Sequence, residues 1–221
     1  MKVLLVAATR AEIEPTILWL EKAQANSRFE VEVLITGVGM TATCFSLCKK
    51  LLKNKYDFVL GAGIGGAFSE NIALGECVIV AQEAFGDLGA EDHERFIDVQ
   101  EMGFQSADEF PFEDGWLRND FKQNPFDING LKKVFAISVN TVSGCANTIQ
   151  NRIEKYVPDI ESMEGAALHF VCLQLDIPFL QVRAISNYVT PRNRDAWEIG
   201  KAVKALNVLL IKWLGAKRYA E

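Results

Sequence analysis

Short apolar runs alternate with longer segments of helical spacing along most of this chain, and this alternation limits the folds that it can adopt. We expect buried strands at Val3–Ala8, Val31–Thr36, Phe58–Ala62, Glu76–Gln82, Val134–Val139 and Phe179–Ile185. We expect helices at Ile13–Ala23, Met40–Lys53, Thr148–Val157, Gly165–Leu175 and Ala196–Leu214. Because strands that alternate with helices form mostly parallel sheets with both faces covered, the pattern predicts a three-layer α/β fold.

The stretch from Phe85 to Gly130 has no clean period, since acidic residues, glycine and phenylalanine alternate irregularly there. We expect loops of the active site and of an interface in this stretch, with one short helix at most. A chain of 221 residues fits one α/β domain. We therefore expect a single domain over residues 1–221.

Charge and composition favour a small molecule as the partner. The net charge of −6 argues against nucleic acid, because proteins that bind its backbone show a basic face. The apolar run at the N-terminus is only about seven residues long and charged residues follow it, so a core strand is expected in place of a signal peptide. No stretch approaches the roughly 20 apolar residues of a membrane span. We expect a soluble cytoplasmic protein with no membrane contact.

The cysteines and histidines do not form a metal-binding pattern. The five cysteines contain no Cys-x-x-Cys pair, and only His93 and His169 are available as imidazole ligands. We expect no metal and read both histidines as structural. Free thiols fit a reducing compartment.

The segment Gly61–Gly66 satisfies the pattern G-x-G-x-x-G and follows a predicted strand, which is typical of dinucleotide-binding folds. That fold requires the last glycine to open a crossover helix. Only the short sequence AFSENIALG separates Gly66 from the next strand, too few residues for a helix and its turns. We expect instead a turn in which the backbone approaches a ligand closely.

Ligands of parallel sheets bind beyond the carboxyl ends of the strands. We therefore expect four segments around one cleft: Ala8–Glu12, Thr36–Gly39, Gly61–Gly66 and Ser186–Arg192.

Four features, in one order along the chain, resemble the superfamily of purine nucleoside phosphorylases and nucleosidases. They are Glu12 after the first strand, the glycine segment Gly63–Gly66, the segment Glu161–Ala167 and the segment Val182–Asn187. The resemblance implies a nucleoside phosphorylase-like fold with a mixed sheet and a purine nucleoside as the ligand. It also implies a homo-oligomer whose neighbouring subunit closes the site, and no cofactor.

The resemblance also implies a role for each site residue. Glu12 matches the glutamate that activates water in hydrolytic members, and Glu164 matches the residue that anchors the ribose hydroxyls. Met163 would contact the ribose, and the turn of Gly63, Ile64 and Gly65 would line the ribose and the nucleophile. Ser186 and Asn187 would face the base. The alternatives from local sequence are a first-turn surface glutamate at 12, a capping glutamate at 164 and a loop asparagine at 187.

Two features indicate the subgroup: the presence of Glu12 and the lack of a phosphate-binding loop. Phosphorolytic members carry a Gly-Asp-Pro-x-Arg loop, whereas only Arg10 and Arg28 occur in the first ninety residues here. With Glu12 in place, the resemblance is to hydrolases. Methylthioadenosine nucleosidases have aspartate where this chain has Asn187. An amide cannot hand over a proton but can complement a 6-oxopurine.

The segments Asn140–Gly144 and Ser186–Trp197 are similar to futalosine hydrolases, which release hypoxanthine in an alternative route to menaquinone. In that case Arg192 would meet the carboxylate of the substrate arm and Trp197 would stack on it. A solvated loop in which Asp195 caps the last helix is an equal alternative for this segment. A methylthioadenosine/adenosylhomocysteine nucleosidase and a non-catalytic nucleoside-binding domain are the alternative functions.

Overall fold

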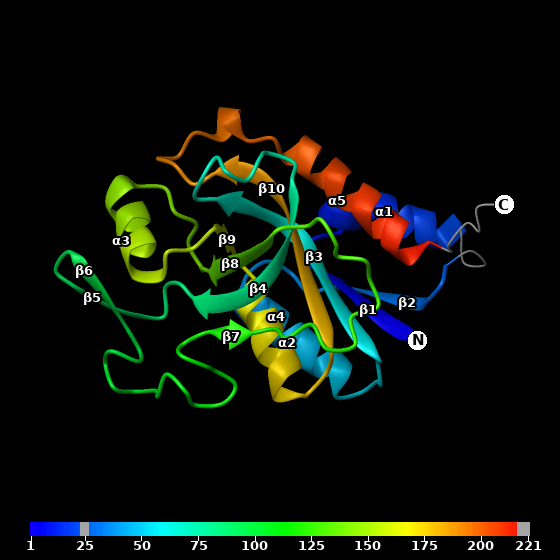
Figure 1. Ribbon diagram of the computed structural model, residues 1–221, viewed down its shortest axis with the longest axis horizontal. Coiled ribbons are helices and arrows are strands. Elements are labelled where there is room, and N and C mark those ends of the chain that lie inside the picture. Colours follow the sequence, from blue (N-terminus) through cyan, green and yellow to red (C-terminus); the bar gives the residue numbers. More distant parts are fainter. Residues whose placement is uncertain (23–26, 216–221) are drawn as a thin grey trace.

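The computed structural model describes residues 1–22 and 27–215 (Figure 1). The strands are β1 Lys2–Ala7, β2 Glu30–Ile35, β3 Phe58–Ala67, β4 Cys77–Phe85, β5 Gly89–Asp92, β6 Arg95–Asp98, β7 Leu117–Arg118, β8 Lys133–Ser138, β9 Ile160–Ser162 and β10 Phe179–Tyr188. The helices are α1 Arg10–Lys22, α2 Met40–Leu51, α3 Ala146–Tyr156, α4 Gly165–Gln174 and α5 Ile199–Leu214, with a 3₁₀ turn at Arg194–Ala196.

Helices cover both faces of the main sheet, so the predicted three-layer α/β fold is confirmed. Helices α1 and α5 pack on one face, where Ile13, Leu206 and Trp213 are buried against β1, β3 and β10. Helices α2 and α4 pack on the other face, where Leu47 and Leu168 are buried. In Figure 1 the two pairs lie on opposite sides of the strands, and α3 lies apart with the small sheet of β5 and β6.

The main sheet is mixed and closes partly on itself. Strands β2, β1, β3 and β10 run parallel in that order. Strand β4 is antiparallel to β10 and parallel to β8, and β9 is parallel to β8 but antiparallel to β3. Because β10 pairs with both β3 and β4, the five strands β3, β10, β4, β8 and β9 form a closed set.

Strand β3 has two partners along one edge. Its first half, Phe58–Gly61, pairs with β1, and its last residues, Gly66 and Ala67, pair with β9. The other edge pairs with β10 along almost the whole strand. Residues 62–65 therefore lie between two partner strands, where side chains from other elements can reach their backbone groups.

The prediction of a turn at the glycine segment is wrong, because Gly61–Gly66 continues β3. The glycines are needed there for close packing. A Cβ at Gly61 would lie 2.4 Å from Leu168 Cδ1, and one at Gly65 would lie 2.9 Å from the Glu161 carbonyl oxygen. The backbone is approached closely by the protein's own atoms, so glycine is required without any left-handed conformation.

The stretch 85–130 contains the hairpin of β5 and β6 and the short strand β7, and no helix. The stretch therefore forms loops and short strands, and the one short helix that the sequence allowed does not form. Strand β9 was also missed, because three residues are too few to show a period. Strand β10 runs to Tyr188, and α5 begins at Ile199, three residues later than predicted. The predicted end of the first helix, Ala23, lies outside the described residues.

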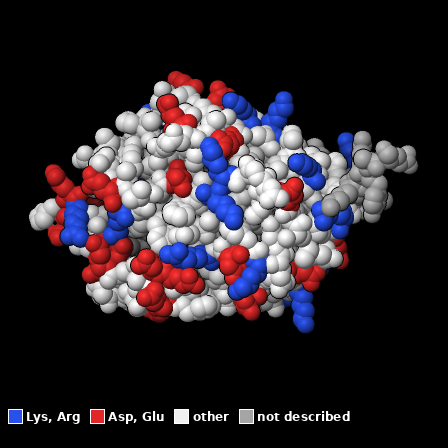
Figure 2. Space-filling view, viewed as in Figure 1, with Lys and Arg blue, Asp and Glu red and all other residues white. Residues whose placement is uncertain are grey.

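Among the described residues, no helix combines the length and apolar character needed to cross a membrane. On the face shown in Figure 2, lysine and arginine side chains are interspersed with aspartate and glutamate and do not form a continuous stripe.

Candidate active site

A cavity of about 360 Å³ opens beside residues 64–66 of β3. It collects side chains from the start of α1, the end of β9 and the end of β10. Eight of the predicted site residues line it: Glu12, Ile64, Gly65, Met163, Glu164, Ser186, Asn187 and Trp197. Gly63 and Arg192 do not line it. The four segments expected around one cleft each contribute to the wall, with Val38 representing Thr36–Gly39.

Glu12 connects the first turn of α1 to β3. Its Oε2 accepts hydrogen bonds from the backbone N–H and the hydroxyl of Thr9, both at 2.9 Å; the first of these is the glutamate half of a capping box. Its Oε1 accepts a hydrogen bond from the Ile64 N–H at 3.2 Å. The carboxylate is therefore fixed between α1 and residue 64 of β3, on the edge that pairs with neither β1 nor β9 at this point. A freely solvated first-turn glutamate does not describe this side chain.

Glu164 occupies the N-cap position of α4, but its side chain makes no capping bond. The hydroxyls of Ser162 and Ser138 instead accept the N–H groups of Gly165 (3.3 Å) and Ala166 (2.7 Å). The Glu164 carboxylate is therefore not used to cap the helix, and it accepts a hydrogen bond from the Gly39 N–H at 3.0 Å. The alternative of a capping glutamate is thus wrong.

Arg183 is a site residue that the sequence analysis did not single out. Its buried guanidinium lies 3.4 Å from the Glu164 carboxylate and donates to the Ile64 carbonyl at 3.3 Å. A Cβ at Gly63 would lie 2.4 Å from Arg183 Nη1 and 3.0 Å from Glu12 Oε1. Gly63 thus leaves room for the guanidinium between the two carboxylates. The available signal was an arginine inside an otherwise apolar strand.

Asn187 lies in β10 where the pairing with β3 shifts register, after Ile185. Such irregularities re-aim side chains and occur beside active sites. The Asn187 amide oxygen accepts the Ser186 hydroxyl at 2.8 Å, and its NH₂ group donates to the Tyr188 carbonyl at 3.2 Å. The interpretation of Asn187 as a residue in a turn is therefore wrong, although the side chain does line the cavity.

A second buried ion pair fixes the loop that follows β8. Glu161 accepts hydrogen bonds from the N–H (2.8 Å) and hydroxyl (2.7 Å) of Ser143 and lies 3.3 Å from Arg152. These contacts hold Val142 and Ser143 against the cavity. Glu161 stands in the motif Glu161–Ala167, but this local pattern does not show that its partners come from a distant loop and helix.

Trp197 lines the cavity, whereas Arg192 is exposed outside it. The Arg192 guanidinium carbon lies 5.5 Å from the centre of the Trp197 ring. The N-cap of α5 is Glu198, so the expectation that Asp195 caps this helix is wrong. The Asp195 N–H instead bonds the Asn193 side chain in the 3₁₀ turn.

His169 is fully buried on α4, where its Nδ1 lies 3.1 Å from the Leu117 carbonyl oxygen and its ring packs on Phe179. Burial lowers its pKa to about 3, so the imidazole is neutral.

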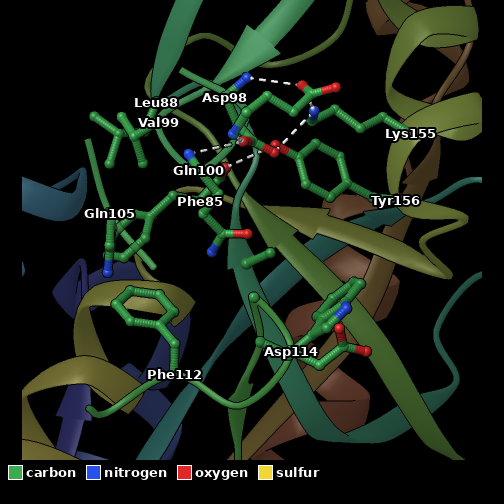
Figure 3. Close-up of a pocket in the computed structure, with 14 residues that line it drawn as sticks. Phe85, Leu88, Asp98, Val99, Gln100, Gln105, Phe112, Asp114, Lys155 and Tyr156 are labelled. Atoms are coloured by element: carbon green, nitrogen blue, oxygen red, sulfur yellow. Dashed lines mark hydrogen bonds and ion pairs between the residues drawn. The ribbon is translucent and has the colours of Figure 1, made fainter. Parts of the chain in front are cut away.

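A separate cavity of about 410 Å³ lies between α3 and the segment that follows β6. Figure 3 shows Lys155 and Tyr156 entering it from α3, opposite Phe112. Lys155 pairs there with Asp98 at 2.8 Å and with Glu101. None of the predicted site residues lines this cavity. The cavity beside β3 is therefore the candidate active site.

The sequence profile of the phosphorylase superfamily matches residues 27–212. The chain belongs to this superfamily. The match covers β2 through most of α5 and so includes every site residue described above except Glu12.

Three relatives show which members of the superfamily are similar. A futalosine hydrolase of Streptomyces coelicolor is 32% identical over 152 residues, which are 68% of this chain and 62% of that protein, less than two thirds of its length. A 5'-methylthioadenosine/S-adenosylhomocysteine nucleosidase of Listeria welshimeri is 26% identical over 72% of this chain and 69% of its own. The structure of a futalosine hydrolase of Helicobacter pylori covers 96% of this chain and 98% of its own, with a TM-score of 0.75 and 15% identity.

Proposed function

We propose that this protein hydrolyses the N-glycosidic bond of a 6-oxopurine nucleoside, with futalosine as the substrate and hypoxanthine as the released base. The observation that carries the proposal is the pair of carboxylates, Glu12 and Glu164, which the backbone N–H groups of Ile64 and Gly39 hold in one apolar-walled cavity. Similarity to futalosine hydrolases supports the choice of substrate.

Cleavage of a nucleoside passes through a ribosyl cation resembling an oxocarbenium ion, as at other glycosidic bonds. Glu12 takes a proton from the attacking water, for which its carboxylate has unused lone pairs beside its bonds to Thr9 and Ile64. Glu164 accepts hydrogen bonds from the ribose hydroxyls. Its negative charge, next to the ring, also favours the cation. The ion pair with Arg183 fixes the orientation of the Glu164 carboxylate.

The base is recognised at the end of β10. Asn187 presents both a donor and an acceptor once its amide exchanges the bonds to Ser186 and Tyr188 for bonds to the purine. The NH₂ group suits N7 and O6 of hypoxanthine, because both atoms accept hydrogen bonds. Trp197 offers an aromatic face for the rest of the substrate, and Arg192, beside it, supplies a cation for a carboxylate on that arm.

Water is favoured over phosphate as the nucleophile. The residues that line the cavity include two glutamates of the proposed mechanism and Glu161, but neither lysine nor arginine. The nearby Arg183 is already paired with Glu164. A phosphate dianion would meet like charge without a free cation, which disfavours its binding.

A methylthioadenosine/adenosylhomocysteine nucleosidase is the second candidate, because such proteins are also similar to this chain. Incubation with futalosine and with methylthioadenosine separates the two, with and without phosphate, followed by chromatography of the base and sugar. Hypoxanthine from futalosine, independent of phosphate, is the expected result. Adenine release would support the second candidate. Binding without turnover would support a nucleoside-binding domain.

The chain also forms a homo-oligomer in the cytoplasm under this proposal. Large apolar side chains are exposed in the stretch after β4, including Phe104 (77%) and Phe110 (67%), and would be covered by a second copy. All five cysteines are free, which fits a reducing compartment. Light scattering during size-exclusion chromatography tests the assembly, and a monomer at micromolar concentration would contradict it.

A further inference from the structure

Glu83, on β4, is a fully buried carboxylate outside the candidate cavity. It lies directly under the N-terminus of α4, where a Cβ at Gly165 would lie only 1.7 Å from Glu83 Oε1. Glycine at position 165 therefore allows the helix to sit on this carboxylate. Burial of a carboxylate costs folding free energy unless other groups form hydrogen bonds with it. The contacts of Glu83 therefore indicate its role.

One chain of contacts leads from Glu83 to the Glu164 carboxylate along β10. Glu83 Oε1 accepts a hydrogen bond from the NH₂ group of Gln181 at 2.7 Å. The amide oxygen of Gln181 then accepts from Arg183 at 3.4 Å, and Arg183 lies 3.4 Å from Glu164. Because an amide has its donor and acceptor on opposite sides, Glu83 fixes which side of Gln181 faces Arg183.

A second chain leads from Glu83 to the backbone around Glu164. The Ser138 hydroxyl donates to Glu83 Oε2 at 3.0 Å and accepts the Ala166 N–H at 2.7 Å. Ser138 also lies 3.4 Å from the hydroxyl of Ser162, which accepts the Gly165 N–H. The carboxyl group of Glu83 therefore supports Glu164 both through its side-chain partner and through the helix start that follows it.

We propose that Glu83 is a positioning residue for Glu164 and that ionised Glu83 holds the ribose site in its more active state. This proposal rests on the proposed nucleosidase function. Glu83 acts through Gln181, Arg183 and Ser138 and does not touch the substrate.

The network has two consistent hydrogen-bond arrangements. With Glu83 ionised, Ser138 donates to it. With Glu83 protonated, its O–H donates to Ser138 and the Ser138 hydroxyl turns to Ser162. Burial raises the pKa of Glu83 to about 7, opposed by Gln181, Arg183 and Ser138, so both arrangements occur near neutral pH.

The charged and titratable groups that face this network are few. Arg183 on β10 favours the ionised form of Glu83, and Glu164 on α4 disfavours it. His169, also on α4, stays neutral because burial lowers its pKa. Ionised Glu83 adds a negative charge behind Arg183 and so favours positive charge on the ribose.

Glu83→Gln tests the proposal because it reproduces the protonated arrangement. Its amide oxygen can accept from Gln181 and its NH₂ group can donate to Ser138. Two quantities are measured between pH 6 and 9. They are kcat/KM for futalosine and, by calorimetry, the Kd of a hypoxanthine nucleoside analogue whose ribose is replaced by a cationic pyrrolidine.

In the wild type we expect both activity and analogue affinity to rise as pH increases through about 7. In Glu83→Gln this rise disappears, and at pH 8.5 both quantities are lower by about tenfold. Binding of free hypoxanthine, which carries no ribose cation, stays within about twofold of the wild type. The exposed Glu113→Gln serves as the control and leaves every profile unchanged.

Ser138→Ala provides a second test that keeps Glu83 ionisable. Because Ser138 lowers the pKa of Glu83, its removal moves the rise to higher pH. The proposal is overturned if the pH profiles of activity and analogue affinity run parallel in wild type and Glu83→Gln. It is also overturned if Glu83→Gln loses as much affinity for free hypoxanthine as for the analogue. If the wild type binds the analogue but does not turn over futalosine, the proposed function is contradicted. The pH dependence of analogue affinity would still test the role of Glu83. Absence of analogue binding by the wild type would overturn both.

Discussion

The carboxylates of Glu12 and Glu164 have different hydrogen-bond and ion-pair partners, and this difference fits the two roles that we propose for them. Glu12 bonds backbone and hydroxyl groups only, whereas Glu164 faces a buried guanidinium. The Glu12 carboxylate keeps unused lone pairs beside its bonds to neutral groups, where a water can donate, whereas Glu164 is held by a charged partner. This contrast supports Glu12 as the base and Glu164 as the anchor.

Replacing Glu12 by Gln removes the proton acceptor while keeping the size of the side chain. We expect kcat to fall by at least about 100-fold, the contribution of a general base, with the Kd for nucleoside within about threefold. Steady-state kinetics and calorimetry measure the two quantities. A variant that retains near-normal kcat would remove Glu12 from the mechanism.

Replacing Asn187 by Asp changes the group that we propose to face the base. An aspartic acid can donate a proton to N7, which suits a 6-aminopurine, whereas the amide cannot. We expect the ratio of kcat/KM for methylthioadenosine over that for futalosine to rise at least about tenfold. An unchanged ratio would place base selection elsewhere.

Glu83 links the buried network to stability. Its pKa in the folded protein, about 7, is above the ordinary value of 4.5, so the folded state binds this proton more tightly than the unfolded state. That contribution is fully present below pH 4.5 and is lost as pH rises through about 7, an effect of up to about 3 kcal/mol.

The measurement is urea unfolding of wild type and Glu83→Gln between pH 5 and 8. The free energy of unfolding of the wild type should fall relative to that of the variant as pH rises. A constant difference between the two proteins would mean that Glu83 does not titrate in this range.

At the scale of elements, β3 shows why the glycine motif was misread. A strand and a turn satisfy the same pattern, and the deciding facts are contacts with Leu168, Glu161 and Arg183, which are all more than 90 residues away. The short strands β7 and β9 were missed for a similar reason, since their pairing is set by partners. The long apolar strands and amphipathic helices were predictable because their pattern is local.

Replacing Gly65 by Ala tests the packing account of β3. The added Cβ would lie 2.9 Å from the Glu161 carbonyl oxygen, an overpacking that should lower the free energy of unfolding by about 1–3 kcal/mol. Gly200 is the matched control, because a Cβ there meets nothing within 4 Å, and Gly200→Ala in α5 should be neutral or stabilising. Equal effects at the two positions would contradict the account.

The candidate site was predictable only in part. Glu12, Glu164 and Asn187 stand in segments that resemble a family, so their sequence context was sufficient to propose them. Arg183 and Glu83 were not assigned roles, because their importance comes from buried contacts that join β4, β10 and α4.

At the scale of the molecule, the closed set of strands brings the ends of β9 and β10 together beside the last half of β3. Helix α1 contributes Glu12, which bonds the Ile64 N–H, and the N-cap of α4 contributes Glu164, which bonds the Gly39 N–H. The arrangement brings the proposed base and the proposed sugar anchor into one cavity, and the described residues that line it include no lysine or arginine. The whole fold therefore favours water as the nucleophile.

The most direct test of hydrolysis is turnover of futalosine in ¹⁸O-labelled water, with phosphate present, followed by mass spectrometry of the sugar product. Hydrolysis at the proposed site predicts free hypoxanthine and an unphosphorylated sugar that carries one ¹⁸O atom. A phosphorylated sugar without the label would contradict hydrolysis, and failure to release hypoxanthine would contradict the substrate.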